Sequence, residues 1–162
     1  ARNGADFGIK VSALGSEWFI GPASMIEGVY FPGYGPEDAN LDIGDSAITE
    51  TAGIGGFALA DSPAILSLIG GSAEDAIKYT KQMCDITMTL NDTFSLPILD
   101  FQGTATGIDL RKVLRTGVLP VIDTAIAHKE PGIGMIGAGL VRPPIDAFKK
   151  ALHAYGVKYH LI

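Results

Sequence analysis

Residues 128–144, HKEPGIGMIGAGLVRPP, contain a glycine pattern that separates two fold classes. From Gly132 to Gly137 the pattern is GxGxxG, which in a Rossmann domain follows a strand, opens a helix and binds a dinucleotide. Here Pro143 and Pro144 prevent a helix from continuing out of the glycines, because proline lacks an amide hydrogen and clashes with the preceding turn. The stretch therefore predicts a glycine loop that lies close to another segment or to an anionic ligand, without NAD or FAD binding.

The turn and capping signals in the rest of the chain intersperse strands and helices without a regular βαβ order. Helices are predicted from residue 45 or 46, over 63–69, from 73, over 109–116 and over 143–155, with Gly156 ending the last one. Strands are predicted over 7–12, 18–20, 29–31, 96–101, 104–108 and 118–126, and residues 32–44 as a loop. We therefore predict an α+β fold, with residues 1–162 forming a single compact domain.

Charge is distributed unevenly along the chain. Residues 1–77 hold eleven acids and two bases, whereas residues 78–162 hold seven acids and ten bases. This asymmetry indicates cation binding, a basic partner, or two halves that complement each other when packed. The net charge of −6 without a basic cluster argues against nucleic-acid binding, and no apolar run approaches a membrane span of about 20 residues. A single cysteine is typical of a protein in the reducing cytoplasm.

The densest acidic segment, GPEDANLDIGDSAITETAGIGG (35–56), also carries hydroxyl groups and glycines that suit contact with a small ligand. Glu50 is its catalytic candidate, and the ligand-binding candidates are Asp45, Ser46, Thr49, Gly53, Gly55 and Gly56. In one alternative the glycines only allow tight packing, and Arg111 or Arg115 neutralises Glu50. In another, Asp42, Asp45 and Glu50 bind a metal ion, although the segment lacks the spacing of a calcium loop and we expect no metal.

His128 is the second catalytic candidate, because its ordinary pKa suits general acid/base chemistry, with a structural histidine as the alternative. Lys129 and Arg142 are cationic candidates for binding an anion, and Gly132 and Gly134 could bring backbone amides close to it. Because the two halves have complementary charge, we expect His128 and the glycines to lie near the 45–56 segment in one shared site.

Several long strings resemble the YlbE/YahG-like family of bacterial proteins. They are RNGADFGIKVS (2–12), GPEDAN (35–40), DIGDSAITETAGIGGF (42–57), GIDLRKV (107–113), IAHK (126–129) and residues 132–144. The resemblance covers nearly the whole chain. Because the members of this family are longer, the chain resembles their carboxy-terminal portion, which agrees with a start at Ala1 instead of methionine.

The resemblance implies a pathway and partners. Family members are encoded beside FdrA-like proteins that resemble acyl-CoA synthetases, and one branch is implicated in oxamate carbamoyl transfer during anaerobic allantoin breakdown. It therefore implies a subunit of a heteromeric carbamoyltransferase that acts with an FdrA-like partner on the anions carbamoyl phosphate and oxamate, as an oligomer without a cofactor. It assigns no catalytic residue. The alternatives are a non-catalytic assembly module that docks the FdrA-like partner, and a metal-dependent enzyme using Asp42, Asp45 and Glu50.

Overall fold

The computed structural model describes residues 1–62, 65–66 and 70–162. The strands in these residues are β1 (Arg2–Asn3), β2 (Asp6–Ile9), β3 (Phe19–Pro22), β4 (Glu27–Tyr30), β5 (Ile43–Gly44), β6 (Thr87–Leu96), β7 (Gln102–Ile108), β8 (Ile122–Ala127) and β9 (Met135–Val141). The helices are α1 (Ser46–Glu50), α3 (Ala73–Asp85), α4 (Leu110–Thr116) and α5 (Ile145–Lys158). The helix predicted over 63–69 lies mostly outside the described residues.

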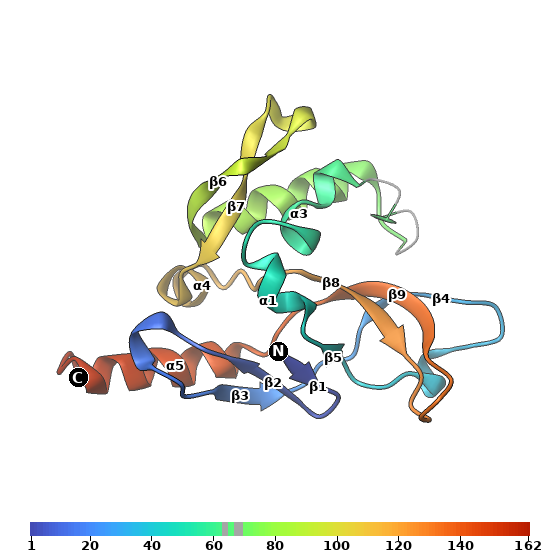
Figure 1. Cartoon of the computed structure of the whole chain (residues 1–162), viewed down its shortest axis with the longest axis horizontal. Coiled ribbons are helices and arrows are strands. Elements are labelled where there is room, and N and C mark those ends of the chain that lie inside the picture. Colours follow the sequence, from blue (N-terminus) through green and yellow to red (C-terminus); the bar gives the residue numbers. More distant parts are fainter. Residues whose placement is uncertain (63–64, 67–69) are drawn as a thin grey trace.

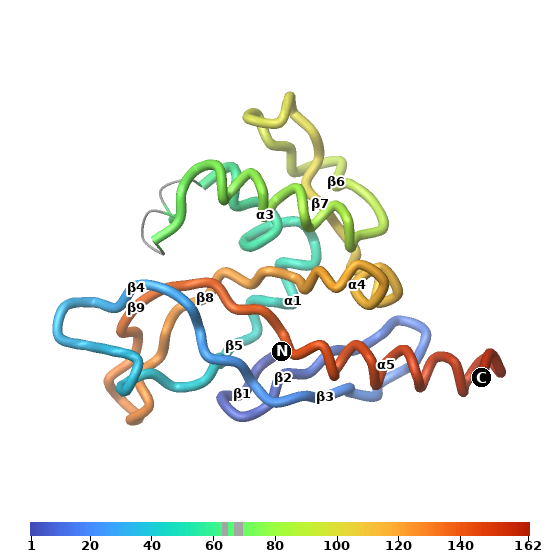
Figure 2. The backbone as a smooth tube through the Cα atoms, turned by 180° about the vertical axis from the view of Figure 1, so that it is seen from behind, coloured from blue at the N-terminus to red at the C-terminus, as the bar shows by residue number. Residues whose placement is uncertain are grey.

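The strands pair as three small antiparallel sheets with the orders β3-β2-β1-β5, β4-β9-β8 and β6-β7. Helix α5 runs along β2 and β3, whereas α3 lies beside the β6–β7 hairpin, which projects from the opposite side of the molecule (Figure 1). The same arrangement is visible from behind, with the chain's amino terminus near the start of α5 (Figure 2). This architecture confirms the predicted α+β class and is not Rossmann-like.

Local signals in the sequence explain where several helices begin. Ser72 and Asp75 form the predicted capping box of α3, with the Ser72 hydroxyl accepting from the Asp75 amide. Asp109 caps α4, and Gly117 ends it with a φ of 73°, which favours glycine. Among the described residues, no helix combines the length and apolarity that crossing a bilayer requires.

The principal core lies where α3, α4 and α5 meet the segment around Phe57. Its buried side chains include Phe57, Met83, Val113 and Phe148. A second cluster, around Ile126 and Ile136, fills the space under β8 and β9. Elements from both halves of the sequence therefore share these cores.

Three sequence predictions about element boundaries are wrong. Of the strand predicted over 96–101, only Leu96 belongs to a strand, as the last residue of β6, and residues 97–101 connect a hairpin in which Asp100 and Phe101 take φ values of 53° and 58°. The missed strand, β6, shows little apolar alternation because most of it is exposed. Gly156 does not end α5, which continues to Lys158. The strand predicted over 118–126 starts only at Ile122.

The glycine pattern over residues 132–139 forms a β-hairpin and brings the chain close to another segment, which was one of the two predicted alternatives. Gly132 and Gly134 have φ values of 90° and 91° in the turn between β8 and β9, where the left-handed region requires glycine. Gly137 and Gly139 lie in β9, where an added Cβ would collide with the backbone of β4. The pattern thus lacks the strand–turn–helix context of a dinucleotide site.

Candidate functional site

Glu50 is the last residue of α1, and its side chain points into the protein with only 3% of the residue exposed. Its Oε1 atom accepts hydrogen bonds from the backbone amides of Gly56 and Asp123, both at 2.8 Å. The Oε2 atom is buried and has no hydrogen-bond partner. The fold therefore fixes one carboxyl oxygen with two hydrogen bonds and buries the other without a partner.

Burial raises the pKa of Glu50 from its ordinary value of 4.5 to about 7. The two backbone hydrogen bonds and the charge of Arg2 oppose this increase, whereas the charge of Asp123 adds to it. Near neutral pH the carboxyl group is therefore present in both its protonated and its ionised forms. This is the condition under which a carboxyl group works best as a general acid or base.

The glycines that follow α1 shape this environment. Gly53 and Gly55 have φ values of 98° and 57°, and added Cβ atoms would collide with Thr104 and with Glu50. Gly56 packs against the backbone of Val121, and its amide donates a hydrogen bond to Glu50. These glycines therefore allow close packing and hold the carboxyl group, and the Gly56 amide that we expected to bind a ligand is already engaged.

Glu50 lines a cavity of about 440 Å³ at the junction of β2, α1, α5 and the start of β8. Most of the wall is apolar, with Phe7, Ile9, Phe57, Leu110, Ile122 and Phe148 among its side chains. Lys10 also lines the cavity, and its Nζ atom lies 4.8 Å from the centroid of the Trp18 ring. Lys10 is exposed, so the cavity has a buried carboxyl group and a cation at its mouth.

A buried ion pair holds the elements beside this cavity together. The Arg2 Nε atom donates to Asp42 Oδ2 at 2.7 Å, and its two other nitrogens donate to Ser46 Oγ and Thr124 Oγ1 at 3.2 and 3.0 Å. Arg2 thereby links β1, the start of α1 and β8. Ser46, expected to contact a ligand, instead accepts a hydrogen bond from Arg2.

The carboxylates of the alternative metal site do not converge. Asp42 is engaged by Arg2, and Asp45 is exposed at the start of α1. Within the part of the chain that the structure describes, no group of three His, Cys, Asp or Glu side chains could hold a metal ion. The proposed neutralisation of Glu50 by Arg111 is also absent, because Arg111 pairs with Asp109 at 2.8 Å.

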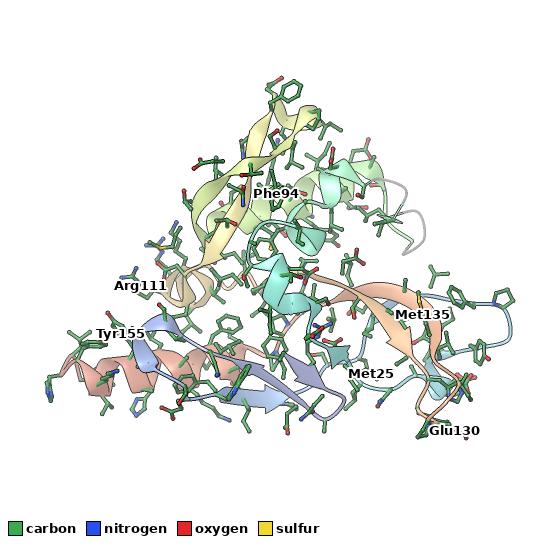
Figure 3. All side chains as sticks on the ribbon, viewed as in Figure 1. Met25, Phe94, Arg111, Glu130, Met135 and Tyr155 are labelled. Carbon is green, nitrogen blue, oxygen red and sulfur yellow. The ribbon has the colours of Figure 1, made fainter. Side chains whose placement is uncertain are left out.

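The expected shared site of Glu50 and His128 does not form. Glu50 binds the amide of Asp123 near the start of β8, whereas His128 follows the last residue of that strand. Five residues of extended strand separate these points by about 16 Å. Glu130 marks the tip of this hairpin, far from α1 (Figure 3). The prediction of a shared site from charge was wrong, because the β8–β9 hairpin places His128 away from α1.

The remaining candidates make local contacts outside the cavity. The His128 Nδ1 atom accepts from the Glu130 amide, and Lys129 Nζ donates to the backbone oxygen of Glu37. Arg142 donates to the backbone oxygen of Leu119 and lies 5.4 Å from the Tyr79 ring centroid. Thr49 donates its hydroxyl to the Ser46 carbonyl. Of the candidates drawn from the sequence, Glu50 alone lines the cavity, and Lys10 was missed.

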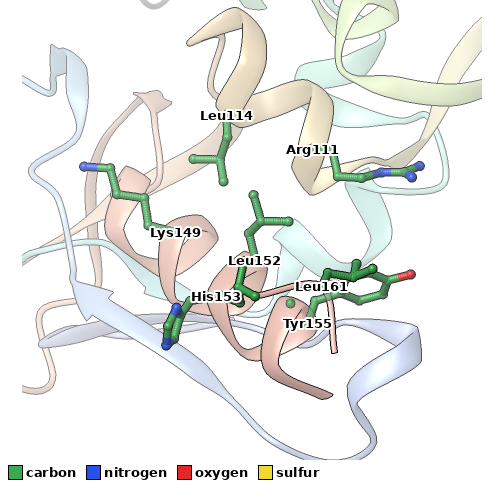
Figure 4. Close-up of a pocket in the computed structure, with 9 residues that line it drawn as sticks. Arg111, Leu114, Lys149, Leu152, His153, Tyr155 and Leu161 are labelled. Carbon is green, nitrogen blue, oxygen red and sulfur yellow. The ribbon is translucent and has the colours of Figure 1, made fainter. Parts of the chain in front are cut away.

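A second cavity, of about 540 Å³, lies between α4 and α5 (Figure 4). Its polar lining side chains are those of Arg111, Lys149, His153 and Tyr155, and leucines such as Leu152 also line it. The Arg111 guanidinium is already bound by both oxygens of Asp109. Because this lining offers no buried, unpartnered polar atom, we place the candidate site at Glu50.

The stability of the protein should depend on pH through Glu50. Between pH 4.5 and 7 the folded carboxyl group keeps its proton whereas the unfolded one has lost it, so the free energy of unfolding falls as pH rises. The loss amounts to up to about 1.4 kcal/mol per pH unit, or about 3 kcal/mol in all. Urea denaturation of the wild type and Glu50→Gln across this range should therefore give curves that diverge.

Burial also raises the pKa of Asp123. Subtracting the free energy of unfolding of one protein from that of the other removes most of the contribution of Asp123. The stabilising contribution of protonated Glu50 is fully present below pH 4.5 and lost above pH 7. Parallel stability curves for the two proteins would contradict the raised pKa.

Comparisons with known proteins match this chain to one family model and to curated relatives. Residues 1–46 match the family described as oxamate carbamoyltransferase subunit AllG. The chain is 54% identical over 98% of its length to uncharacterized protein YahG of Escherichia coli (strain K12), covering 34% of that protein. It is 48% identical over 94% of its length to oxamate carbamoyltransferase subunit AllG of the same organism, covering 37% of it.

The fold also matches a solved structure, described as a conserved protein of unknown function from Enterococcus faecalis V583. The TM-score is 0.92 at 59% sequence identity, over 94% of this chain and 37% of that one. The chain spans about a third of the length of the curated relatives that it matches. Along nearly all of its own length, these matches support a relationship of this chain to the YahG/AllG family.

Proposed function

We propose that this chain is part of a subunit of a heteromeric carbamoyltransferase, which works in the cytoplasm with an FdrA-like partner in allantoin degradation. In this proposal it transfers a carbamoyl group between carbamoyl phosphate and oxamate. The observation that carries the proposal is the 48% identity to a protein named oxamate carbamoyltransferase subunit, over 94% of this chain. The Glu50 cavity supplies a place for the chemistry.

The proposed reaction needs a base and a cation. The nitrogen of the acceptor attacks the carbonyl carbon of carbamoyl phosphate, a C–N bond forms, and the C–O bond to phosphate breaks. Glu50 Oε2, buried and unpartnered, takes the proton that the nitrogen loses. Lys10, at the mouth of the same cavity, favours the negative charge of the departing phosphate. The partner subunit supplies the remaining donors to the developing oxyanion.

Reconstitution tests the proposal. The protein as its gene encodes it, mixed with an FdrA-like protein, carbamoyl phosphate and oxamate, should form N-carbamoyl oxamate at a rate that neither protein reaches alone. Product is measured directly by chromatography, because free phosphate would also arise from hydrolysis of carbamoyl phosphate. Equal product formation when this protein is left out would contradict a catalytic contribution.

The assembly-module alternative is favoured by one feature, the projecting β6–β7 hairpin (Figure 1). It exposes large apolar side chains, among them Met88, Phe94, Ile98 and Phe101, the last with 71% of its surface exposed. Exposed apolar groups gathered on one element are typical of a protein interface. If the chain only docks the FdrA-like partner, replacing Phe94 and Phe101 with serine abolishes copurification, and changes at Glu50 leave turnover of the assembled complex unaltered.

A further inference from the structure

The connection of the β6–β7 hairpin, residues 97–101, holds an exposed phenylalanine in a strained backbone conformation. Ile98 and Phe101 are 53% and 71% exposed. Asp100 and Phe101 have φ values of 53° and 58°, a left-handed conformation that aspartate tolerates but that is unfavourable for a bulky side chain. A hydrogen bond of 3.0 Å from the Phe101 amide to the Leu96 carbonyl oxygen fixes this conformation. Burying Phe101 in the fold does not explain its placement, whereas contact with another surface does.

The same hairpin is acidic. Residues 82–108 contain three acids, Asp85, Asp92 and Asp100, and no lysine or arginine. All three carboxylates lie on exposed residues. Two hairpins that face one another would bring these like charges together, which is unfavourable. The surface that receives the hairpin therefore combines an apolar cavity with a positively charged rim.

The cavity of about 540 Å³ between α4 and α5 has both properties. Leu114 and Leu152 point toward one another across it (Figure 4). The two helices contain six lysines and arginines against one acid, Asp146. Lys149 lines the cavity, and its pair with Asp146 is weak, because the two side chains are 3.4 Å apart and both 61% exposed. Lys149 is therefore available to another carboxylate.

We infer that the α4–α5 cavity of one copy of this protein binds the β6–β7 connection of a second copy. Phe101 enters the cavity beside the leucines, and Asp100 pairs with Lys149 on the rim. The occupant is a second copy because one molecule carries both complementary surfaces, an acidic apolar projection and a basic apolar cavity. Since the hairpin projects away from α5, a molecule does not fill its own cavity (Figure 1).

This inference goes beyond the proposed function and does not depend on carbamoyl transfer. It also gives the hairpin a different occupant from the assembly-module alternative, in which an FdrA-like partner covers it. Because the connection and the cavity are different surfaces of one molecule, each copy can both provide and receive the contact.

The first test is sedimentation velocity of the protein as its gene encodes it, over a range of concentrations and without a partner protein. The wild type should self-associate, and Phe101→Asn should weaken the association about thirtyfold, the loss typical of a central aromatic contact. Asparagine tolerates a positive φ, so this variant should keep or raise the melting temperature. Phe31→Asn is the matched control, because Phe31 is 46% exposed beside β4, and it should associate like the wild type.

A mixing experiment tests the cavity as the receiving surface. Lys149→Glu replaces an exposed side chain on the rim and should weaken the association about tenfold, because attraction to Asp100 becomes repulsion. Phe101→Asn keeps an intact cavity and Lys149→Glu keeps an intact hairpin. Mixed at a concentration at which neither associates alone, the two variants should form pairs through one wild-type contact. Lys78→Glu makes the same charge change at an exposed position of α3 and should associate like the wild type.

A wild-type protein that stays monomeric throughout the range would overturn the inference, as would self-association that Phe101→Asn or Lys149→Glu leaves unchanged. A mixture that does not recover pairs would also overturn it, because the hairpin would then contact a different surface. None of these readouts involves carbamoyl transfer, so failure of this inference is distinguishable from failure of the proposed function.

Discussion

Replacing Glu50 with glutamine should lower kcat for carbamoyl transfer by about 10²- to 10⁴-fold, the usual contribution of a general base. Glutamine has nearly the same shape, and its carbonyl oxygen can still accept from the amides of Gly56 and Asp123. What it loses is the ability of the second atom to take a proton. Turnover per folded molecule should therefore fall while the local structure is kept.

The matched control is Glu74→Gln, which makes the same chemical change at an exposed position in the first turn of α3. It should retain wild-type turnover. The pH profile provides a second readout: kcat/KM of the wild type should rise with pH through an apparent pKa of about 7 as Glu50 ionises, and Glu50→Gln should lose that step. A Glu50→Gln variant with unchanged kcat would contradict a catalytic role of Glu50 and would favour a structural role of the 45–56 segment.

The sequence identified Glu50 but not its surroundings. Its glycine and hydroxyl neighbours pointed to a ligand-binding segment, and the structure instead uses those glycines to bring the chain against Glu50. One of the two amides that bind its carboxyl group belongs to Asp123, 73 residues further along. Such a contact depends on how β8 packs beside α1, and no local pattern of residues encodes it.

Lys10 and Arg2 were missed for the same reason. They are the two bases of the first 77 residues, and no local pattern indicates that Lys10 lines the cavity of Glu50 or that Arg2 pairs with Asp42. His128 is the opposite case, because its predicted proximity to Glu50 does not occur. Complementary charge between the halves predicted proximity, but a β-hairpin extends its tip away from the body of the molecule.

Predictions that depended on local chemistry held better. The capping box of α3 and the Asp109 and Gly117 boundaries of α4 agree with the structure, because these signals act within a few residues. The double proline correctly excluded a helix directly after the glycines. The prediction missed strand β6, which pairs only with β7 and is exposed along most of its length. Its sequence therefore lacks the alternation of apolar and polar residues that is typical of a half-buried strand.

Replacing Arg2 with methionine should lower the free energy of unfolding by about 3–5 kcal/mol, because the Asp42 carboxylate is then buried without its partner. Arg2 and Asp42 are 5% and 1% exposed, and their contact is 2.7 Å. The same change also leaves Thr124 without the donor that Arg2 provides. Urea denaturation, evaluated with the same slope for both proteins, measures the difference.

Two comparisons separate this effect from a general cost of losing a charge. Lys149→Met breaks the pair with Asp146, in which both side chains are 61% exposed, and should change stability little because solvent screens such pairs. Arg2→Met combined with Asp42→Leu removes both buried charges and should recover much of the lost stability, since no unpaired ion remains in the interior. If Arg2→Met proves as mild as Lys149→Met, or if the double variant is no more stable than Arg2→Met alone, the ion pair does not hold β1 and β8 in the way its geometry indicates.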